Sequence, residues 1–486
     1  MGRLGVMVLG CFVLTVGMWA LNVARFKHNT VSAKELRPIK RGKDINEGTP
    51  PPIVVMPVNG VKEKKIQRGK PPEKTQSKGK RKPRGVTVNR RAIIENVTLE
   101  DLRAPEGRMW IPAAMVGPVS PEASDPFVNV AVAYCQLDMT SYHETPWLFA
   151  MGTFHQLHSG CLSDPTLVKT YRLSSLAAIV DQNPDEFLDP TGFIYHETRC
   201  GSTLSANMLA AVPSNIVHSE TPPPVVAVNL CSKCNDELRG RLVRTVFRLM
   251  GPAQHGHTHL FFKFQNSKYL TNVEKAWPDV KWVYLFRDPL EVMASNLKGA
   301  WRKNQVKRET LGSPDGSKPD YFLGGPCVRA IAKHKRGANK EKDPPSELLV
   351  SECARQLETL NEVALDQIRN GSPNGLVVDY RQLPEALTEY VYPVHFGMAE
   401  YQGERDAYKT WMEPVTHMYS KGMANGQEPT FSKEYKQGMD IAGKEEGSDE
   451  AMRQAAEGMC GTYRAMVGMQ RWLKQREGDT IGTCAR

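Results

Sequence analysis

Two short segments of the sequence combine cationic and hydroxyl side chains at the ends of apolar runs. The first reads ETRCGSTL and spans 197–204, between a run that predicts a strand and a run that predicts a helix. A turn at that place points backbone N–H groups at one spot in front of the helix, where the helix dipole favours an anion. Gly201 allows close approach, Ser202 and Thr203 add hydroxyl donors, and Arg199 adds a fixed positive charge. The segment therefore predicts a cradle for a phosphate-like anion.

The second segment places an arginine at the end of another apolar run. The strand predicted over 280–286 is followed by Arg287. A proline two residues later favours the start of a helix, and Ser295 falls about two turns into that helix. The arginine and the serine could hold a second anion at the same sheet edge. The alternative is a structural Arg287 paired with Asp288. The first segment is not a Walker A loop, because GxxxxGK[ST] is absent from it.

The elements that would position these segments alternate between strands and helices. Continuous apolar or aromatic runs predict strands over 193–197, 259–264, 280–286 and 375–380. Helical periodicity predicts helices over 203–212, 267–277, 346–370 and 448–474. Continuous apolar strands that alternate with helices indicate a parallel sheet covered on both faces. We therefore predict an α/β fold, a three-layer sandwich around a central parallel sheet.

Together the two segments resemble the sulfotransferase family that uses 3′-phosphoadenylyl sulfate (PAPS). In that family a strand–loop–helix of the form RxG[ST]TL binds the 5′-phosphosulfate end of the donor. A strand ending RDP, with a serine eight residues after the arginine, binds the 3′-phosphate. This sequence has Arg199 to Leu204 in the first form, and Arg287 with Ser295 in the second. The resemblance covers roughly 190–385 and implies a P-loop NTPase-like fold.

The resemblance also assigns a set of residues to the donor. The implied donor-binding residues are Arg199, Cys200, Gly201, Ser202, Thr203, Leu204, Arg287, Ser295 and Lys421. Of these, Lys421 would close over the nucleotide from a C-terminal loop. No metal is implied, because lysine, arginine and backbone donors can neutralise the charge. One departure is Arg381, in VVDYRQLP at 377–384, where the family commonly has glutamate.

A base is needed to activate the hydroxyl or amine that accepts the sulfuryl group. In the Golgi tyrosylprotein and heparan-type enzymes, this base is a glutamate at the end of the next strand. Glu220 lies 21 residues after Arg199, and both the spacing and the following threonine resemble the tyrosylprotein enzymes. The resemblance assigns Glu220 as the base, with Arg199 and Lys263 as catalytic cations. A carboxylate that caps the turn before Pro222 is the alternative.

Other titratable groups compete with Glu220 for that role. His196, Glu197 and His218 lie close to the same predicted strand ends. Cytosolic members of the family place a histidine after a later strand, and the comparable stretch 262–265 has none. Three histidines precede that stretch: His255, His257 and His259. Single histidines in such segments are commonly structural.

The N-terminus predicts a membrane anchor. Residues 4–24 form a run of 21 residues without a charge, and about 20 apolar residues span a bilayer as a helix. No clean small-residue cleavage site follows, so we expect an uncleaved signal anchor, with a cleaved signal peptide as the alternative. The charges on either side do not decide the orientation. With residues 1–3 as a cytosolic tail, the protein would be a single-pass type II protein of the Golgi membrane with a lumenal body.

The positive charge of the chain belongs to one segment. The net charge is +10, but residues 25–91 hold 20 Lys and Arg against 5 Asp and Glu, and Arg3 adds one more positive charge, which leaves residues 92–486 at −6. A stretch rich in Lys, Arg, Pro and Gly cannot bury enough apolar surface to fold. We expect a flexible stem over 25–105 and a catalytic domain over 106–486, with an exposed insertion over 300–345. No nucleic-acid partner is expected, although KGKRKPR in the stem resembles a nuclear signal.

Cysteines and sequons agree with a lumenal body. The chain has 10 cysteines, for which an oxidising lumen favours disulfides whose pairing the sequence leaves open. Cys231 and Cys234 have metal or redox spacing, but no second pair completes a zinc site. Asn96 and Asn370 stand in N-glycosylation sequons. Asn370 with Gly371 also resembles the end of a helix.

These features favour a sulfotransferase that moves a sulfuryl group from PAPS to a hydroxyl or amine in the secretory pathway. The acceptor would be a glycan or a protein, with a glycan as the default, and the oligomeric state stays open. One alternative is a nucleotide-dependent kinase or NTPase on a related fold, against which the missing Walker lysine argues. Another is a non-catalytic lumenal protein that keeps the fold.

Overall fold

The computed structural model describes much of the chain after residue 91. The described residues are 92–146, 165–297, 327, 346–398, 405–416, 450–470 and 484. They all belong to the compact unit Lys80–Arg486. The predicted anchor, most of the predicted stem, Lys421 and all of the predicted insertion except Cys327 lie outside them. Within the described ranges, no helix combines the length and the apolar character that crossing a membrane requires.

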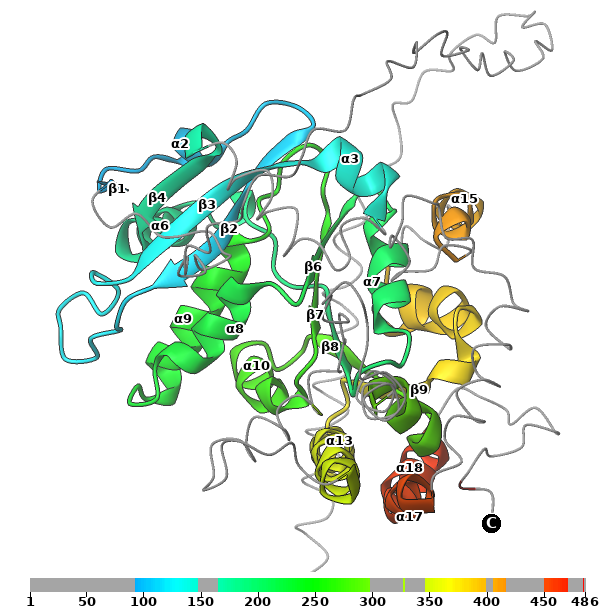
Figure 1. The fold of residues 1–486 in the computed structure, drawn as a ribbon. Coiled ribbons are helices and arrows are strands. Elements are labelled where there is room, and N and C mark those ends of the chain that lie inside the picture. The colour runs from blue at the N-terminus through cyan, green and yellow to red at the C-terminus, as the bar shows by residue number, and fades with distance from the viewer. Residues whose placement is uncertain are drawn as a thin grey trace, which may run out of the picture. The chain divides into compact units, whose positions relative to one another are not determined.

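A five-stranded sheet forms the centre of this unit (Figure 1). Its strands, in spatial order, are β6 (Asn215–Ser219), β7 (His259–Phe264), β5 (Gly192–His196), β8 (Lys281–Phe286) and β9 (Gly375–Asp379). Every pair of neighbouring strands is parallel. Nearly all residues of these strands are buried, which explains their unbroken apolar sequences. The predicted α/β class with a central parallel sheet is confirmed.

The order of the strands reverses at β5. The chain passes from β5 to the outer strand β6, returns to β7, and then crosses to β8 and β9 on the other side of β5. In open parallel sheets, ligands bind outside the carboxyl ends of the strands at such a reversal. Here the reversal lies between β5 and β8, which pair His196 with Leu285 at their ends. Both segments predicted to bind anions follow directly on these two strands.

The sequence pattern does not predict the second sheet, which has four strands. Its strands, in spatial order, are β1 (Ile93–Ile94), β4 (Val168–Arg172), β3 (Ala131–Asp138) and β2 (Arg108–Val116). Helix α2 (Leu99–Leu102) follows β1 and begins with a capping box between Thr98 and Asp101. Leu102 is buried in the core of this sheet. Both β1 and α2 lie in the stretch assigned to the stem, so regular structure begins earlier than the sequence suggests.

Helix α9 (Asp236–Leu249) lies between the two sheets and packs against both (Figure 1). Val243 and Phe247 belong to the core of the central sheet, whereas Leu242 and Val246 belong to the core of the second sheet. Each pair is spaced four residues apart, so two neighbouring stripes of one helix face different sheets. The other helices of this layer are α6 (Leu173–Gln182), α8 (Pro222–Leu230) and α10 (Leu270–Ala276).

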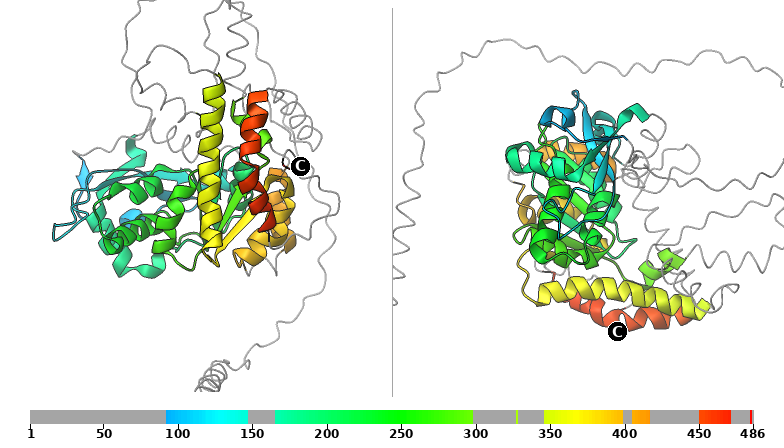
Figure 2. Two further views of the ribbon diagram at one scale, coloured as in Figure 1. Left: turned by 90° about the horizontal axis from the view of Figure 1, so that it is seen from below. Right: turned by 90° about the vertical axis from the view of Figure 1, so that its left-hand side faces the viewer.

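The remaining helices cover the opposite face and the β9 edge. On the opposite face lie α7 (Ser202–Ala210), the π-helix η5 (Leu387–His395) and α15 (Arg405–Thr416) (Figure 1). At the edge, α13 (Ser346–Arg369) and α18 (Cys460–Gly468) pack on β9, and α13 runs alongside α17 (Glu450–Gly458) and α18 in both views of Figure 2. The short helices are α3 (Met139–Glu144), η1 (Pro165–Leu167), η2 (Pro184–Glu186), η3 (Ser267–Tyr269) and η4 (Tyr380–Gln382).

The C-terminal helix of the sequence prediction is two helices in the structure. Periodicity predicts one helix over 448–474, whereas α17 and α18 lie on either side of Met459. The break falls between Gly458 and Gly461, since glycine weakens a helix interior. The described disulfides join Cys231 to Cys234, Cys327 to Cys353 and Cys460 to Cys484. The CxxC pair, with its metal or redox spacing, is therefore oxidised here.

The ring of Phe247 provides a test of the layer between the sheets. Its centroid lies 4.5 Å from that of Phe262 and 5.3 Å from that of Trp277. We expect Phe247→Ala to lower the free energy of unfolding by about 3–5 kcal/mol, because it leaves a cavity in a close-packed core. Urea unfolding followed by circular dichroism measures the change. The control Val128→Ala, at a side chain that is 40% exposed, should change it by less than about 0.5 kcal/mol. Equal losses in both variants would contradict this packing.

Candidate active site

The first segment forms a tight loop between β5 and α7. After His196 the backbone has positive φ at Thr198 (126°), Arg199 (56°) and Gly201 (79°). Successive backbone N–H groups in such conformations can converge to form an anion-binding concavity. Gly201 is the N-cap residue of α7, so the N–H groups of the first turn, which have no partner within the helix, open onto the loop. The loop can therefore hold an anion through its backbone.

Gly201 is required by the packing of the loop as well as by its backbone conformation. A Cβ atom at this position would lie 2.6 Å from Cδ1 of Leu383 and 2.9 Å from Cδ2 of Tyr380. Both residues follow β9, so the loop packs closely against the chain that leaves the sheet there. From the sequence, the glycine at 201 is expected because it lets a ligand come close to the backbone. The structure adds a second reason, because Leu383 and Tyr380 pack so closely against Gly201 that no side chain fits there.

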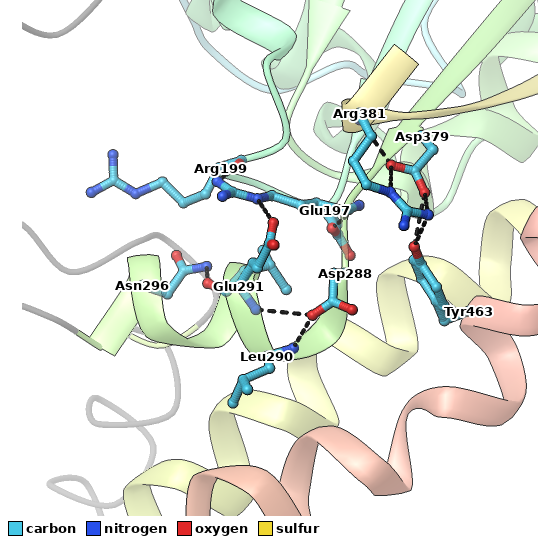
Figure 3. Close-up of polar contacts among 11 residues, drawn as sticks. Glu197, Arg199, Asp288, Leu290, Glu291, Asn296, Asp379, Arg381 and Tyr463 are labelled. Carbon is cyan, nitrogen blue, oxygen red and sulfur yellow. Dashed lines mark hydrogen bonds and ion pairs between the residues drawn. The ribbon is translucent and has the colours of Figure 1, made fainter. Parts of the chain in front are cut away.

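The side chains of the loop divide between the core and the surface. Cys200 is buried in the core, and burial raises the pKa of its thiol to about 12. Its side chain therefore stays protonated and faces the protein interior. Ser202 is buried, whereas Arg199, Thr203 and Leu204 are half-buried. Figure 3 shows the Arg199 side chain extending away from the other labelled side chains, where it can meet a ligand.

Arg287 connects the second segment to the first. Its Nη1 donates to the carbonyl oxygen of Arg199 at 3.3 Å, and its Nε donates to Oε2 of Glu291 at 2.9 Å (Figure 3). The guanidinium carbon lies 4.4 Å from the ring centroid of Tyr380, a cation–π contact. Tyr380 is also the residue against which Gly201 packs. One positive charge is thus held at the point where the two segments meet.

Asp288 and Ser295 lie on the helix that follows Arg287. Residues 289–297 are helical. Oδ1 of Asp288 accepts two backbone N–H groups of the first turn at 3.0 and 3.2 Å (Figure 3). Asp288 therefore caps the helix, and Arg287 forms an ion pair with Glu291, so each has a partner besides the one that the sequence alternative gave it. Ser295 follows Glu291 by one turn, so it lies on the helix face that Arg287 contacts.

Glu220, assigned by resemblance as the base, lies at the end of β6 among ionisable groups from two other strands. Its Oε1 accepts Nζ of Lys263 at 2.8 Å and contacts Nε2 of His196 at 3.1 Å. Lys263 is 2% exposed, whereas the Glu220 side chain is 42% exposed. The carboxylate is thus ion-paired with Lys263, in contrast to the alternative in which it caps the turn before Pro222. The sheet brings the three predicted residues together at its carboxyl edge.

The neighbours of Glu220 decide its charge. Burial disfavours the ionised carboxylate, but the Lys263 ammonium and the His196 ring outweigh burial and hold the pKa of Glu220 well below its usual range. Glu220 is therefore ionised at neutral pH. Its backbone also has a φ of 55°, a strained conformation for a residue other than glycine. A strained, charged residue at a sheet edge is a feature that active sites commonly show.

The rival histidines have structural partners. Nε2 of His218 lies 2.7 Å from the carbonyl oxygen of Met250, and burial lowers the pKa of His218 to about 4. Nδ1 of His257 lies 2.5 Å from the carbonyl oxygen of Gln254, and burial lowers its pKa to about 4 as well. Both rings are therefore neutral at physiological pH. His196 is the histidine that joins the Glu220 cluster.

Glu197, another rival base, is closed off from solvent. It is 0% exposed. Its Oε1 accepts the backbone N–H of Arg287 at 2.6 Å, and its Oε2 accepts Nδ2 of Asn361 at 3.0 Å. Burial raises the pKa of Glu197 well above its usual range, against the effect of both hydrogen bonds. Because Asn361 comes from α13 and follows no motif, sequence reasoning missed this contact.

Arg381, which departs from the family pattern, pairs with Asp379 at the end of β9. Its Nη2 donates to Oδ2 of Asp379 at 2.7 Å and to the hydroxyl of Tyr463 at 2.6 Å (Figure 3). The Tyr463 hydroxyl donates to the same carboxylate oxygen at 2.8 Å. Tyr463 belongs to α18, so these contacts tie the C-terminal helices to the sheet edge that carries the site. No local pattern could have revealed contacts over this distance in sequence.

Both predicted glycosylation acceptors are exposed. Asn96 lies between β1 and α2, and Asn370 directly follows α13. Gly371, with a φ of 89°, ends that helix in a left-handed conformation, as expected for a helix terminus. Exposure at these positions would permit glycosylation.

Comparisons with known proteins give distant likenesses. No protein-family model and no curated protein sequence matches the chain. The chain is similar to a solved sulfotransferase from Alicyclobacillus acidocaldarius over 58% of its own length and 95% of that chain, with 13% identity and a TM-score of 0.26. It is similar to the sulfotransferase domain from the curacin biosynthetic pathway over 57% and 98%, with 13% identity and a TM-score of 0.29. Likenesses with such TM-scores carry no argument, so a function must rest on the geometry of the site.

The pairing of Glu220 with Lys263 predicts a pH-dependent stability. At pH 7, Glu220→Gln should lower the free energy of unfolding by about 1–2 kcal/mol, less than for a fully buried pair because Glu220 is partly exposed. The folded-state pKa of Glu220 is depressed, so the stabilisation is present above its unfolded pKa of about 4.3 and is lost as the pH falls further. The wild-type chain should therefore lose more stability than the variant on acidification below that pH.

Denaturant unfolding measured at neutral and acidic pH checks this expectation. Asp236→Asn is the matched control, since Asp236 also pairs with a lysine, Lys275, but at an exposed site. The control should show little change in stability at neutral pH. Parallel acid profiles for Glu220→Gln and the wild type would contradict the assigned pairing.

Proposed function

We propose that the chain is a PAPS-dependent sulfotransferase. The observation that carries the proposal is the contact of Arg287 Nη1 with the Arg199 carbonyl at 3.3 Å, which joins two anion-binding segments at the reversal of strand order. A ligand with an anionic group at each end suits two such neighbouring sites better than a single phosphate does. PAPS is such a ligand, with a phosphosulfate at one end and a separate 3′-phosphate. The arginine, hydroxyl and backbone donors of the site are those that bind phosphate.

The two segments would divide the donor between them. Arg199, the loop backbone and the hydroxyls of Ser202 and Thr203 would hold the phosphosulfate end. Arg287 and Ser295 would hold the 3′-phosphate, since Ser295 lies on the face of the helix over 289–297 that Arg287 contacts. Bound PAPS would supply the sulfuryl group. Lys421 keeps its proposed role in closing over the nucleotide.

Glu220 and Lys263 suit the proton and charge changes of sulfuryl transfer. As the acceptor oxygen or nitrogen bonds to sulfur, Glu220 would take the proton that the acceptor loses. As the bond between sulfur and the bridging phosphate oxygen breaks, Lys263 and Arg199 would stabilise the negative charge on that oxygen. Lys263 now pairs with Glu220 at 2.8 Å. A lysine that turned to the phosphate would free the carboxylate and raise its pKa, which would make Glu220 a stronger base.

The charge on the donor is balanced in this proposal by side chains. Arg199, Lys263 and Arg287 supply positive charge from three strand ends, so no metal is called for. Within the part of the chain that the structure describes, no group of three or more His, Cys, Asp or Glu side chains could hold a metal ion. A kinase or NTPase remains the second candidate, because strand–loop–helix turns also bind nucleoside triphosphates.

The cellular setting and the acceptor are part of the same proposal. The uncharged run 4–24 and the sequons at Asn96 and Asn370 favour a single-pass type II protein of the Golgi membrane with a lumenal catalytic domain. The disulfides Cys231–Cys234 and Cys460–Cys484 suit an oxidising compartment. We propose a glycan or protein hydroxyl or amine as the acceptor, and no nucleic-acid partner.

Ligand-dependent thermal stability tests the donor site. We expect 3′,5′-ADP at a hundred times its Kd to stabilise the chain by about 2.7 kcal/mol, and ATP with Mg²⁺ to have no effect. Differential scanning fluorimetry measures both. Arg287→Ala should abolish the shift, whereas Arg355→Ala, at an exposed arginine paired with Glu352 on α13, should keep it. Stabilisation by ATP with Mg²⁺ and not by 3′,5′-ADP would favour the kinase instead.

Transfer of ³⁵S from labelled PAPS to a panel of polysaccharides and peptides tests the reaction and identifies the acceptor class. Once an acceptor is found, Glu220→Gln should lower kcat by about 10²–10⁴-fold, the usual contribution of a general base, while 3′,5′-ADP still binds. The exposed-carboxylate variant Asp236→Asn should retain wild-type transfer. Undiminished transfer by Glu220→Gln would show that another group is the base.

A further inference from the structure

The carboxyl group of Glu197 is buried where the two anion-binding segments meet, and it belongs to neither proposed anion site. It begins the first segment, and its Oε1 accepts the backbone N–H of Arg287, the first residue of the second segment, at 2.6 Å. The backbone N–H of Glu197 donates to the carbonyl of Leu285 at 3.3 Å, which extends the pairing of β5 with β8. Main chain and side chain of one residue thus hold the two segments together.

A second carboxylate oxygen connects the segments to a long helix. Oε2 of Glu197 accepts Nδ2 of Asn361 on α13 at 3.0 Å, and Oδ1 of Asn361 accepts the hydroxyl of Tyr284 on β8 at 2.7 Å. All three residues are buried. Burying a carboxylate is unfavourable compared with burying an apolar side chain of similar size. A network in which every polar group has a partner fixes one geometry. A requirement for that geometry can therefore explain why a carboxyl group is buried here.

The segment that Glu197 begins is strained. Thr198 and Arg199 follow it with φ values of 126° and 56°, and each such residue costs of order 1–3 kcal/mol when it is not glycine. The far end of the strained stretch is held where Gly201 packs on Tyr380. The near end is held by Glu197. Arg287 then spans the two ends, because it donates to the Arg199 carbonyl and stacks on Tyr380.

We propose that Glu197 is a positioning residue that sets the separation between the two anion sites, so that one ligand can occupy both at once. The inference rests on the proposed function, because the ligand it concerns is a nucleotide with a 5′-phosphate and a 3′-phosphate. Glu197 acts through Arg287 and the loop and does not touch the ligand. Loss of the Glu197 carboxyl group should reduce the extra affinity that the second phosphate provides. It should reduce the affinity for a ligand with a single phosphate much less.

The experiment compares 3′,5′-ADP with 5′-AMP by isothermal titration calorimetry. In the wild type, the ratio of the two affinities is the gain from the 3′-phosphate. In Glu197→Gln, an NH₂ group replaces one of the two carboxylate oxygens. This group faces either the Arg287 N–H or Asn361 Nδ2, which are both donors, so one hydrogen bond is lost. We expect the gain to fall by about tenfold, within the usual range of coupling between sites, while the affinity for 5′-AMP changes much less.

A matched control separates positioning from stability. Glu274 also accepts two hydrogen bonds, from Nε1 of Trp282 and the hydroxyl of Ser372, both at 2.7 Å. Both bonds are to Oε1, and Glu274 serves the opposite end of β8. Glu274→Ala, which removes this acceptor, should therefore lower the melting temperature without changing the gain from the 3′-phosphate. If Glu197→Gln does not fold, Asn361→Ala removes one of the two carboxylate contacts and should give a smaller loss of the gain.

The outcomes distinguish this inference from the proposed function. If the wild type gains from the 3′-phosphate and Glu197→Gln gains equally, the positioning role is wrong and the donor assignment stands. If Glu274→Ala loses the gain as strongly as Glu197→Gln, the effect is one of general stability and the positioning role is again wrong. If the wild type does not bind 3′,5′-ADP better than 5′-AMP, the proposed function fails, and the positioning role fails with it.

Discussion

The parallel pairing of β5 with β8 is the interaction on which the rest of the site depends. Its register places His196 opposite Leu285, so the chain leaves both strands at the same level of the sheet. Arg199 and Arg287, 88 residues apart in the sequence, can then share a hydrogen bond. A slip of one residue would turn the side chains of a strand to the opposite face and would separate these groups. The buried apolar residues on both faces of the two strands resist such a slip.

Ionisable groups around this edge each have a partner from another element. Lys263 on β7 pairs with Glu220 at the end of β6, Glu197 accepts the backbone of Arg287, and Asp379 holds a cation that also contacts α18. Removing one member of a buried pair leaves an uncompensated charge, which costs more than the pair contributes. The protein's own contacts thus organise the edge, and preorganised donors need little rearrangement when charge develops in a reaction.

Sequence patterns predicted the elements whose signal is local and missed those whose signal is not. β7, β8 and β9 were predictable because strands buried on both faces read as unbroken apolar runs. The second sheet escaped prediction because β2 contains Pro112 next to an irregularity in its pairing, and β4 mixes apolar and charged residues. Among the site residues, Arg199, Glu220 and Arg287 stood in recognisable spacings. Asn361 and Tyr463 did not, because each reaches the edge from an element distant in the sequence.

The sequence by itself determined which side chains the two segments predicted to bind anions contain, and the strand–turn–helix setting of each. Both follow from side-chain types, glycine and apolar periodicity over a few residues. Only the tertiary structure decided which groups face a ligand and which serve the fold. It paired Glu220 with Lys263, buried Cys200, and placed Glu197 between the segments. The physical reason is that burial and charge pairing depend on neighbours that the strand order brings together, and strand order is a property of the whole sheet.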